Sequence, residues 1–461
     1  MLHTRWRLLL AICILANAVN AQSVSERKLL AARIDQSLKP YVDTDNFTGV
    51  VLVSRNGRVL FEKGYGWANV ELKVANNPQM RFHVASITKT FTAAAILLLV
   101  ERGKLKISDT VATLLPDYPN GAKLTIEHLL THTSGIPNTG GLAGWSDEER
   151  KPHTLPELVG LFKDKPLEFE PGTRTSYSNS NYNLLALLIE KISGQSYTSF
   201  LQENIFGPLA LRATLNNSDA AQLIPNRATG IEPDGVSGAR YPRYIDWSSV
   251  LGSGSLVTTA RDLDTFVTAL FGRKFLTANS VALITRPAEG FAYGWLREER
   301  FGRKQIRAGG RSPGYNVSVE RYLDDGTNVI VLSNSYSPVA QDFDFLNGLH
   351  SAVFGRPTTA PGIKPMQVRA GSLQQFAGQY RLPHDYFIPD AVITLSESGD
   401  HLDAYWSSGG KNTVIPIGEN RFLDRNYWAR LTFTHNPNGS ISGFSYEVAG
   451  QKFVAVKLPN H

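Results

Sequence analysis

The stretch SITKTFTAAAILLLVER, residues 86–102, decides how the rest of the chain is interpreted. Its side chains are apolar on nearly every face of a helix, and Gly103 follows where a helix commonly ends. A helix that is apolar all round is a buried one, so we expect other elements to surround it. The stretch opens with the tetrad SITK, in which Lys89 lies one turn from Ser86 on the same helix face.

The tetrad pairs a hydroxyl with an amine that could remove its proton. A serine hydroxyl is a poor nucleophile until a neighbouring base takes its proton, and a lysine with an ordinary pKa of about 10.4 is almost wholly protonated at pH 7. Burial and the positive end of the helix dipole both disfavour the ammonium form here. Ser86 is therefore a candidate nucleophile and Lys89 its base. From the tetrad alone, a capping serine followed by a lysine that reaches solvent is an equal alternative.

Other serines fit nucleophile patterns but lack this context. The S-x-x-K pattern also starts at Ser25, in a polar stretch, and at Ser408, just before a Gly-Gly turn. The run GGRSPG around Ser312 fits the G-x-S-x-G pattern of a nucleophile elbow. However, the residue after Ser312 is Pro313, which has no N–H to donate to an oxyanion, and the next residues alternate like a strand.

A second motif lies directly before an apolar helix that we expect over residues 181–194. It is the triplet Tyr177-Ser178-Asn179, and the same Y-x-N spacing at residues 118–120 shows that the pattern alone is weak. A tyrosine hydroxyl next to a lysine can pass protons between a nucleophile and a leaving group. An asparagine amide can orient both the lysine and a substrate carbonyl. Tyr177 and Asn179 are therefore further candidates.

The order of the expected elements indicates an α/β (α+β) fold. Two β-rich runs over residues 49–69 flank Asn56-Gly57, a strong hairpin signal. Helices are expected over 86–102, 181–194 and 259–272, strands return after about residue 290, and a helix is expected over 343–355. We therefore predict one antiparallel sheet, built from both ends of the segment and flanked by helices, with a helical subdomain between them.

A Pro/Gly/Thr-rich run separates this segment from the C-terminal part. We predict a signal peptide over residues 1–21, a main domain over 22–355, a linker over 356–368 and a small all-β barrel or sandwich over 369–461. The leader has a basic start, a short apolar run and a small-residue cleavage site after Ala21. The protein is therefore expected to be secreted or periplasmic, without stable membrane insertion once the leader is removed.

Composition excludes several classes of function. The 47 basic and 41 acidic side chains give a net charge of +6 without any basic run with interleaved aromatic residues, so nucleic-acid binding is not expected. The single cysteine, Cys13, lies in the leader, which rules out a disulfide, a cysteine nucleophile and a thiolate metal site in the mature chain. His128 and His132 have the i, i+4 spacing of a zinc pair, but the Glu of H-E-x-x-H and a third ligand are missing. No metal or cofactor is expected.

Six landmarks in order resemble the serine β-lactamase-related family, which includes class C β-lactamases, low-molecular-mass penicillin-binding proteins, D-aminopeptidases and esterases. The resemblance covers about residues 35–350. The landmarks are FTGVVLVSRNGRVLFEKGYGWAN, FHVASITKTFTAAAILLLVERGKLKISDTV, LTIEHLLTHTSGIP, FEPGTRTSYSN, GSGSLVTTARDL and GGRSPGY. The run LQQFAGQY, residues 373–380, resembles the start of the small β-barrel appended to many members.

The resemblance implies a two-step acyl transfer that cleaves an ester or amide. It makes Ser86 the acylated nucleophile, Lys89 its base partner, Tyr177 the proton shuttle and Asn179 the polar clamp. It also implies that the backbone N–H groups of Ser86 and of Arg311 hold the oxyanion. Gly309 and Gly310 then line the same strand beside the substrate.

One departure from the family pattern leaves the substrate open. Where the third motif usually carries Lys or His, this chain has Ala308, so recognition of a substrate carboxylate is in doubt. A basic side chain between Arg297 and Arg311 could replace that cation, or these side chains could form a solvated strand face. The expected partner is a small-molecule or peptide substrate, with cell-wall material as one source, and the protein is expected to be a monomer. The alternative is a catalytically silent binding or sensor protein.

Overall fold

The computed structural model describes residues 25–273, 275–286, 290–357, 363–369, 371–407, 409–448 and 450–459. The leader predicted over residues 1–21 lies outside the described residues, as does Ser408. The described chain opens with a helix over residues 25–42, which the sequence analysis did not predict. None of the helices that these residues form is both long and apolar enough to cross a membrane.

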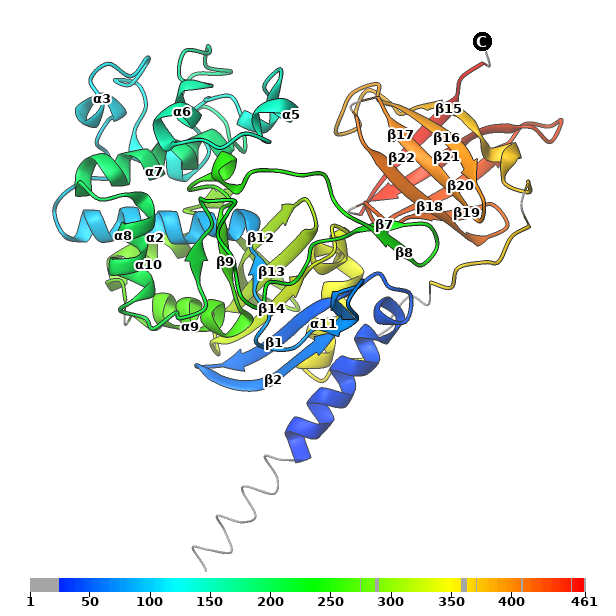
Figure 1. Ribbon diagram of the computed structural model, residues 1–461, viewed down its shortest axis with the longest axis horizontal. Helices are drawn as coiled ribbons and strands as arrows, with labels where there is room; N and C mark the ends of the chain where they lie inside the picture. The colour runs from blue at the N-terminus through cyan, green and yellow to red at the C-terminus, as the bar shows by residue number, and fades with distance from the viewer. Residues whose placement is uncertain are drawn as a thin grey trace, which may run out of the picture.

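A seven-stranded antiparallel sheet forms the centre of the main domain (Figure 1). Its order is β10-β11-β12-β13-β14-β1-β2, so strands from the two ends of the segment meet where β14 pairs with β1, as predicted. The predicted hairpin joins β1 to β2, and Asn56 and Gly57 take the positive φ angles that its turn requires. The strands are β1 (Gly49–Arg55), β2 (Arg58–Tyr65), β10 (Phe291–Ala292), β11 (Trp295–Arg300), β12 (Arg303–Ser312), β13 (Tyr315–Tyr322) and β14 (Thr327–Ser333).

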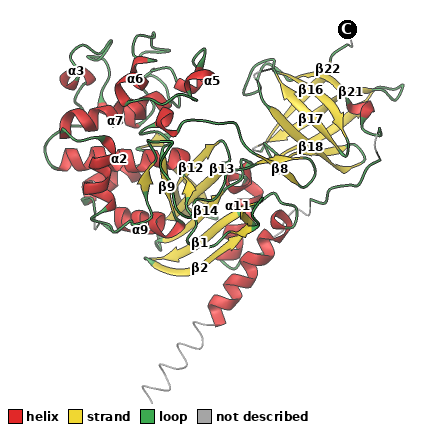
Figure 2. Ribbon diagram, viewed as in Figure 1, coloured by secondary structure: helices red, strands yellow, loops and turns green. Residues whose placement is uncertain are grey.

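Helices cover both faces of this sheet, and the alternation along β1 shows how (Figure 2). Val50 and Leu52 join the core that contains the central apolar helix α2 (Thr88–Glu101), whereas Val51 and Val53 join the core beneath α11 (Phe343–Val353) and the helix over residues 25–42. Successive strand side chains point to opposite faces, so the four consecutive apolar residues 50–53 fit a sheet buried on both sides.

The predicted helical subdomain surrounds α2 on the first face. Its helices are α3 (Val111–Leu114), α4 (Ile126–Leu130), α5 (Trp145–Glu148), α6 (Leu155–Gly160), α7 (Asn179–Ser193), α8 (Tyr197–Leu201), α9 (Ala260–Phe271) and α10 (Ala278–Thr285). Two helix starts differ from the sequence-based expectation. Ser86 lies in a short 3-10 helix, η1 (Ala85–Ile87), just before α2, and α7 begins two residues earlier than expected. Consequently Asn179 is the first residue of α7.

The C-terminal part is a closed eight-stranded antiparallel barrel with its own apolar core. This settles the predicted choice between a barrel and a sandwich. Figure 1 shows the barrel beside the main domain, next to the hairpin formed by β7 (Glu232–Asp234) and β8 (Gly238–Arg240). The barrel strands are β15 (Gly378–Arg381), β16 (Val392–Ser398), β17 (His401–Trp406), β18 (Lys411–Gly418), β19 (Arg421–Asp424), β20 (Ala429–His435), β21 (Ile441–Val448) and β22 (Gln451–Lys457).

Candidate active site

Ser86 is positioned by the chain that enters α2 and by a short strand beside it. The preceding strand β5 (Phe82–His83) pairs with β9 (Leu256–Thr258), and the backbone N–H of Val84 donates to Leu256 O at 3.0 Å. The N–H of Leu256 in turn donates to the Thr88 hydroxyl at 3.1 Å. Ala85 has a φ of +44°, which is costly for a residue with a side chain. The turn is therefore held by its surroundings and not by local preference.

Lys89 is buried directly below Ser86, with only 2% of its surface exposed. Its Nζ lies 3.1 Å from Ser86 Oγ, 2.8 Å from Asn179 Oδ1 and 2.7 Å from the backbone oxygen of Ser253. No carboxylate contacts it among the described residues, and burial holds the pKa of the Lys89 amine well below its usual value. At pH 7 the fraction of Lys89 that is the neutral amine is therefore far larger than for a solvent-exposed lysine.

Tyr177 and Asn179 complete a polar cluster around the Ser86 hydroxyl. The hydroxyl of Tyr177 lies 2.7 Å from Ser86 Oγ and donates to Asn179 Oδ1 at 3.3 Å. Burial raises the pKa of the Tyr177 phenol to about 12, so it keeps its proton at neutral pH. The structure thus brings together four residues that the sequence separates by up to 93 positions, and we call Ser86, Lys89, Tyr177 and Asn179 the Ser86 cluster.

His132 supports Tyr177 and does not pair with His128. Its Nδ1 accepts the backbone N–H of Ser178 at 3.1 Å, and its ring packs on that of Tyr177 with 4.6 Å between centroids. His128 lies in a capping box at the start of α4, where it exchanges hydrogen bonds with Thr125. The described residues contain no group of three or more His, Cys, Asp or Glu side chains that could hold a metal ion.

The strand β12 passes beside Ser86 at Gly310. A Cβ atom on Gly310 would lie 2.2 Å from Val84 O and 3.0 Å from Ser86 N, so only glycine fits this approach. A Cβ on Gly309 would meet Gln341 on the opposite face of the sheet. Since β11 pairs with β12 only as far as Arg307, residues 308–312 have no strand partner on that side within the described part of the chain. Their backbone groups there are free to face a substrate.

A cavity of about 230 Å³ opens over the Ser86 cluster. Its charged lining residues are Glu149, Arg243 and Arg311, and Arg243 makes an ion pair with Glu149. Ser312 also lines this cavity, so the elbow-like run does wall the site, although its hydroxyl has no hydrogen-bond partner among the described groups. The remaining lining residues are Ala85, Ser86, Gly140, Trp145, Asn179, Ile245, Trp247, Val250, Ser253, Gly254, Pro313 and Tyr336.

No arginine of β11 or β12 takes the place of the missing cation at residue 308. Ala308 itself is 4% exposed and lies in the core. Arg297 donates to Thr285 O, Arg303 pairs with Asp324 and Asp325, Arg307 pairs with Glu298 and Arg311 donates to Asn426 O. Together with the hydrogen bond from Arg300 to Asn347 Oδ1, these contacts direct all five guanidinium groups of β11 and β12 to partners within the protein. The remaining cation of the two strands, Lys304, is exposed.

Three features of the site were not found from the sequence. The backbone oxygen of Ser253 has no side-chain signature, although it lies within the landmark GSGSLVTTARDL. Glu149 and Arg243 lie in segments without regular periodicity, so nothing indicated that they meet. Tyr336 was overlooked because it follows β14 in a loop, yet it lines the cavity and packs on Arg311.

Comparison with known proteins gives one family and several relatives. The family model described as Beta-lactamase matches residues 34–350. The chain is 28% identical to penicillin-binding protein 4* of Bacillus subtilis over 430 residues, which cover 87% of this chain and 93% of that protein. D-amino acid amidase from Ochrobactrum anthropi SV3 superposes with a TM-score of 0.62 at 23% identity, over 71% of this chain and 99% of that one. The octameric penicillin-binding protein homologue from Pyrococcus abyssi superposes with a TM-score of 0.62 at 22% identity. That superposition covers 92% of this chain and 99% of the other.

Proposed function

The chain belongs to the beta-lactamase family, and on that premise we propose that it is an exported serine hydrolase that cleaves an ester or amide through an acyl-Ser86 intermediate. The observation that carries the proposal is the contact of Ser86 Oγ with both Lys89 Nζ and the Tyr177 hydroxyl. The relation to penicillin-binding protein 4* and the fold shared with an amidase support hydrolase chemistry in general terms.

The contacts of Lys89 suit a neutral amine acting as the base. Such an amine has two N–H groups, which match the two acceptors Asn179 Oδ1 and Ser253 O. Its lone pair is then left to face Ser86 Oγ at 3.1 Å. As Ser86 Oγ attacks the substrate carbonyl, its proton passes to Lys89 Nζ.

Tyr177 is suited to donate a proton and not to remove one. Because its pKa is raised to about 12, its hydroxyl carries a proton to the leaving oxygen or nitrogen when the tetrahedral intermediate collapses. The Lys89 ammonium then returns a proton to the Tyr177 phenolate. The two groups are neighbours, because Lys89 Nζ and the Tyr177 oxygen both contact Ser86 Oγ and Asn179 Oδ1. Attack of water on the acyl group releases Ser86 by the reverse transfers.

The oxyanion is held by two backbone N–H groups in this proposal, those of Ser86 and Arg311. The close approach of β12 at Gly310 supports this arrangement. Gly310 brings the backbone of residues 308–312 against residues 84–86, which we call the Ser86 turn. Losing one such donor typically costs about 3 kcal/mol of transition-state stabilisation. Gly309 and Gly310 allow the strand to lie this close to both neighbours.

The charges around the cavity favour a substrate that is neutral near the scissile bond. Ala308 supplies no cation, Arg243 is neutralised by Glu149, and the side chain of Arg311 is directed to Asn426 O. A carboxylate next to the reacting carbonyl would lose its hydration without gaining a matched partner. We therefore propose a small ester or an uncharged amide as substrate, in preference to a β-lactam.

The proposal also retains what the sequence predicts about the protein outside the site. Export rests on the N-terminal leader, and a monomer acting on small-molecule or peptide substrates remains the proposed state. The proposed boundary between the main domain and the barrel remains the linker predicted over residues 356–368.

Covalent labelling tests the nucleophile. The purified protein is incubated with a fluorophosphonate probe or with a fluorescent penicillin, and its intact mass is measured. We expect a single fluorophosphonate adduct that is lost in Ser86→Ala and kept in Ser312→Ala, the matched serine of the same cavity. Absence of any adduct with either reagent would favour the catalytically silent alternative, and an adduct on Ser312 would refute the assignment.

A pair of esters tests the substrate class. p-Nitrophenyl butyrate and the p-nitrophenyl half-ester of succinic acid have acyl chains of the same length, but only the second ends in a carboxylate. We expect kcat/KM to be about 10-fold higher or more for the butyrate, because the carboxylate finds no partner in the cavity. Equal or faster cleavage of the succinate ester would show that a cation near Ser86 is available after all.

A further inference from the structure

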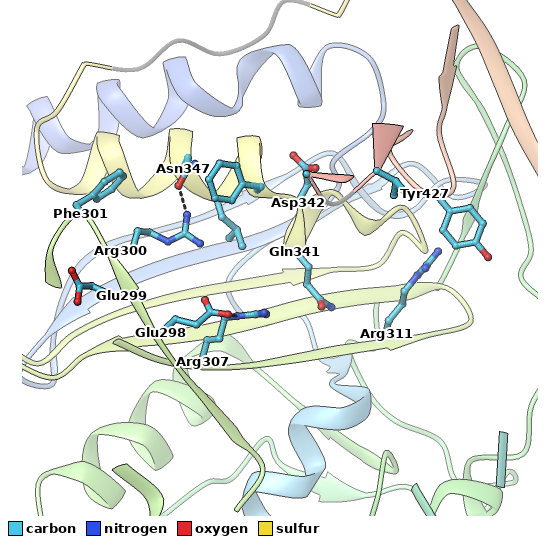
Figure 3. A pocket seen from close by; sticks show the side chains of 14 residues that line it. Glu298, Glu299, Arg300, Phe301, Arg307, Arg311, Gln341, Asp342, Asn347 and Tyr427 are labelled. Atoms are coloured by element: carbon cyan, nitrogen blue, oxygen red, sulfur yellow. Dashed lines mark hydrogen bonds and ion pairs between the residues drawn. The ribbon is translucent and has the colours of Figure 1, made fainter. Parts of the chain in front are cut away.

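The barrel reaches the main domain close to the end of β12 that borders Ser86. At this junction lies a cavity of about 870 Å³, which is lined by β11, β12, α11 and the barrel (Figure 3). Arg311 lines both this junction cavity and the smaller cavity above Ser86. The same residue therefore borders the barrel with its side chain and the Ser86 turn with its backbone.

The side chain of Arg311 is held by the barrel. Its Nη2 donates to the backbone oxygen of Asn426 at 2.7 Å. Its guanidinium carbon lies 5.0 Å from the ring centre of Tyr427 in the same barrel loop, and 4.0 Å from that of Tyr336 in the main domain. Figure 3 shows Arg311 extended toward Tyr427. The guanidinium is thus fixed by one hydrogen bond and by contacts with two aromatic rings.

Hydrogen bonds fix the backbone of the barrel loop that holds Arg311. Asp424 Oδ1 accepts the backbone N–H groups of Asn426 and Tyr427 at 2.8 and 3.2 Å. The side-chain oxygen of Asn426 accepts the N–H of Thr413 at 2.9 Å. A loop with its backbone groups bonded in this way has few other conformations, so its carbonyl oxygens present fixed acceptors.

Arg425, in the same loop, anchors the barrel in the main domain. Its side chain is fully buried. It donates to Asn46 Oδ1 at 2.9 Å, to Gly235 O at 2.7 Å and to Asp45 O at 3.2 Å. Burial lowers its pKa to about 10, so the guanidinium still carries its charge at neutral pH. Removing a buried charged donor with several acceptors is costly, so these hydrogen bonds fasten the barrel loop to the main domain.

We propose that the C-terminal barrel positions the hydrolytic site, because its loop over residues 424–428 holds Arg311 and thereby the free end of β12 against the Ser86 turn. This inference rests on the proposed function. Arg311 acts here as a positioning residue through its side chain, whereas its backbone N–H is the proposed oxyanion donor. Among the residues that the structure describes, 308–312 lack a strand partner on one side, so the barrel contact takes the place of that partner.

The test removes the side chain of Arg311 and keeps its backbone. In Arg311→Ala we expect the rate of Ser86 acylation by a fluorophosphonate, and kcat for p-nitrophenyl butyrate, to fall by about 10- to 100-fold. KM and the thermal unfolding temperature should change little. The junction cavity gives a small cation access to the vacated space, so added methylguanidine should restore part of the lost rate.

A matched control crosses the same domain boundary without touching β12. Arg430 donates to Asp344 Oδ2 in α11 at 2.9 Å, and both side chains are 40% exposed. Arg430→Ala should therefore keep the wild-type acylation rate. Arg425→Met, which loosens the anchor, should lower the rate as Arg311→Ala does, and the double variant should be no slower than the slower single one.

The outcomes separate this inference from the proposed function. A wild-type protein that forms no Ser86 adduct contradicts the proposed function itself. An adduct that forms at the wild-type rate in Arg311→Ala overturns only the positioning role. A loss of rate that follows a loss of folded protein and is not restored by methylguanidine also overturns it, because that would make Arg311 a general stabiliser of the domain junction.

Discussion

Two clusters of buried ionisable side chains lie on opposite faces of the same sheet, and they differ in how their charge is balanced. The Ser86 cluster lies on the α2 face, and its Lys89 amine has no carboxylate in contact among the described groups. On the α11 face, fully buried Glu320 makes an ion pair with His350 Nε2, and the Tyr322 hydroxyl lies 2.6 Å from His350 Nδ1. We call Glu320, Tyr322 and His350 the Glu320 cluster.

The balance of charge separates a reactive cluster from a structural one. Burial alone would raise the pKa of the Glu320 carboxyl, but His350 and the guanidinium groups of Arg300 and Arg307 outweigh it and lower that pKa. For Lys89 burial acts without such compensation, and the pKa of the amine falls. A compensated charge stays in its ionised form and holds the fold together, whereas an uncompensated amine gives up its proton and becomes a base. Among the described residues, Ser86 and Asn179 of the Ser86 cluster also line a cavity that could admit a substrate.

The largest effect is expected when the uncompensated amine is removed. Lys89→Met keeps most of the side-chain volume but leaves Ser86 without a base, so the rate of acylation by a fluorophosphonate should fall by about 10³-fold. Circular dichroism should show an unchanged fold. Lys63→Met, at a lysine 47% exposed and paired with Asp35 on the surface, is the control and should keep the wild-type rate. An unchanged rate in Lys89→Met would show that another group deprotonates Ser86.

Removing the charge of Glu320 should lower the free energy of unfolding and leave the acylation of Ser86 unchanged. Glu320→Gln removes one partner of a buried ion pair, which typically costs about 3–5 kcal/mol in the free energy of unfolding. The Ser86 acylation rate per folded molecule should stay as in the wild type. Glu298→Gln, at a carboxylate that pairs with Arg307 and is 35% exposed, should cost about 1 kcal/mol or less.

The pH dependence of stability sharpens this prediction. The pKa of Glu320 is lower in the folded protein than its ordinary value of 4.5, so its contribution to stability is present above pH 4.5. That contribution is lost as the pH falls through the folded-state pKa. The difference in unfolding free energy between the wild type and Glu320→Gln should therefore be greatest above pH 5 and shrink in acid. A difference that grows in acid would contradict the assignment of Glu320 as a compensated anion.

A single substitution can give the Lys89 amine of the Ser86 cluster a carboxylate partner, so that its charge is balanced as in the Glu320 cluster. Asn179→Asp places a carboxylate where Oδ1 now lies 2.8 Å from Lys89 Nζ. An opposite charge at this distance raises the pKa of the amine, so kcat/KM for p-nitrophenyl butyrate at pH 7 should fall by about 10²-fold. The wild-type rate should rise with pH as Lys89 loses its proton, and in the variant this rise should move to higher pH. A loss of rate that is the same at every pH would show that Asn179 acts by geometry alone.

Much of the fold follows from hydrophobic patterning, and its short elements do not. The run over residues 86–102 is too apolar for anything but a central helix, and Asn56-Gly57 fixes the hairpin that starts the sheet. The short strands have no detectable period and exist because of the partners they meet. β3 (Trp67–Asn69) pairs with the nearby β4 (Val74–Ala75), and β9 pairs with both β5 and β6 (Leu215–Asn216), which are distant in sequence. Likewise, the positive φ of Ala85 is imposed by its neighbours.

Only the parts of the candidate site whose residues are close in sequence could be predicted from their spacing. The i, i+3 relation brings Lys89 to Ser86, and the triplet brings Tyr177 close to Asn179, but only the resemblance joined the two pairs. The direction of a side chain on an open strand end is set by the partner it finds. The sequence analysis assigned the backbone N–H of Arg311 to the oxyanion and its side chain to a group of cations near the site, whereas the structure directs that side chain to the barrel.

The smallest effect is expected from the hydroxyl that completes the Glu320 cluster. Tyr322→Phe removes the O–H that lies 2.6 Å from His350 Nδ1, while the ring keeps its packing against Phe354 at 4.7 Å between centroids. The substitution leaves the buried His350 Nδ1 without its hydrogen-bond partner, which costs about 1–2 kcal/mol of unfolding free energy. Chemical denaturation measures this loss, and Tyr197→Phe, which removes a buried hydroxyl 2.7 Å from Thr92 Oγ1, is the matched control on the α2 face. If charge balance is what distinguishes the two clusters, both variants lose stability by similar amounts and keep the Ser86 acylation rate. A loss of acylation in Tyr322→Phe would instead connect the two faces of the sheet and break the comparison.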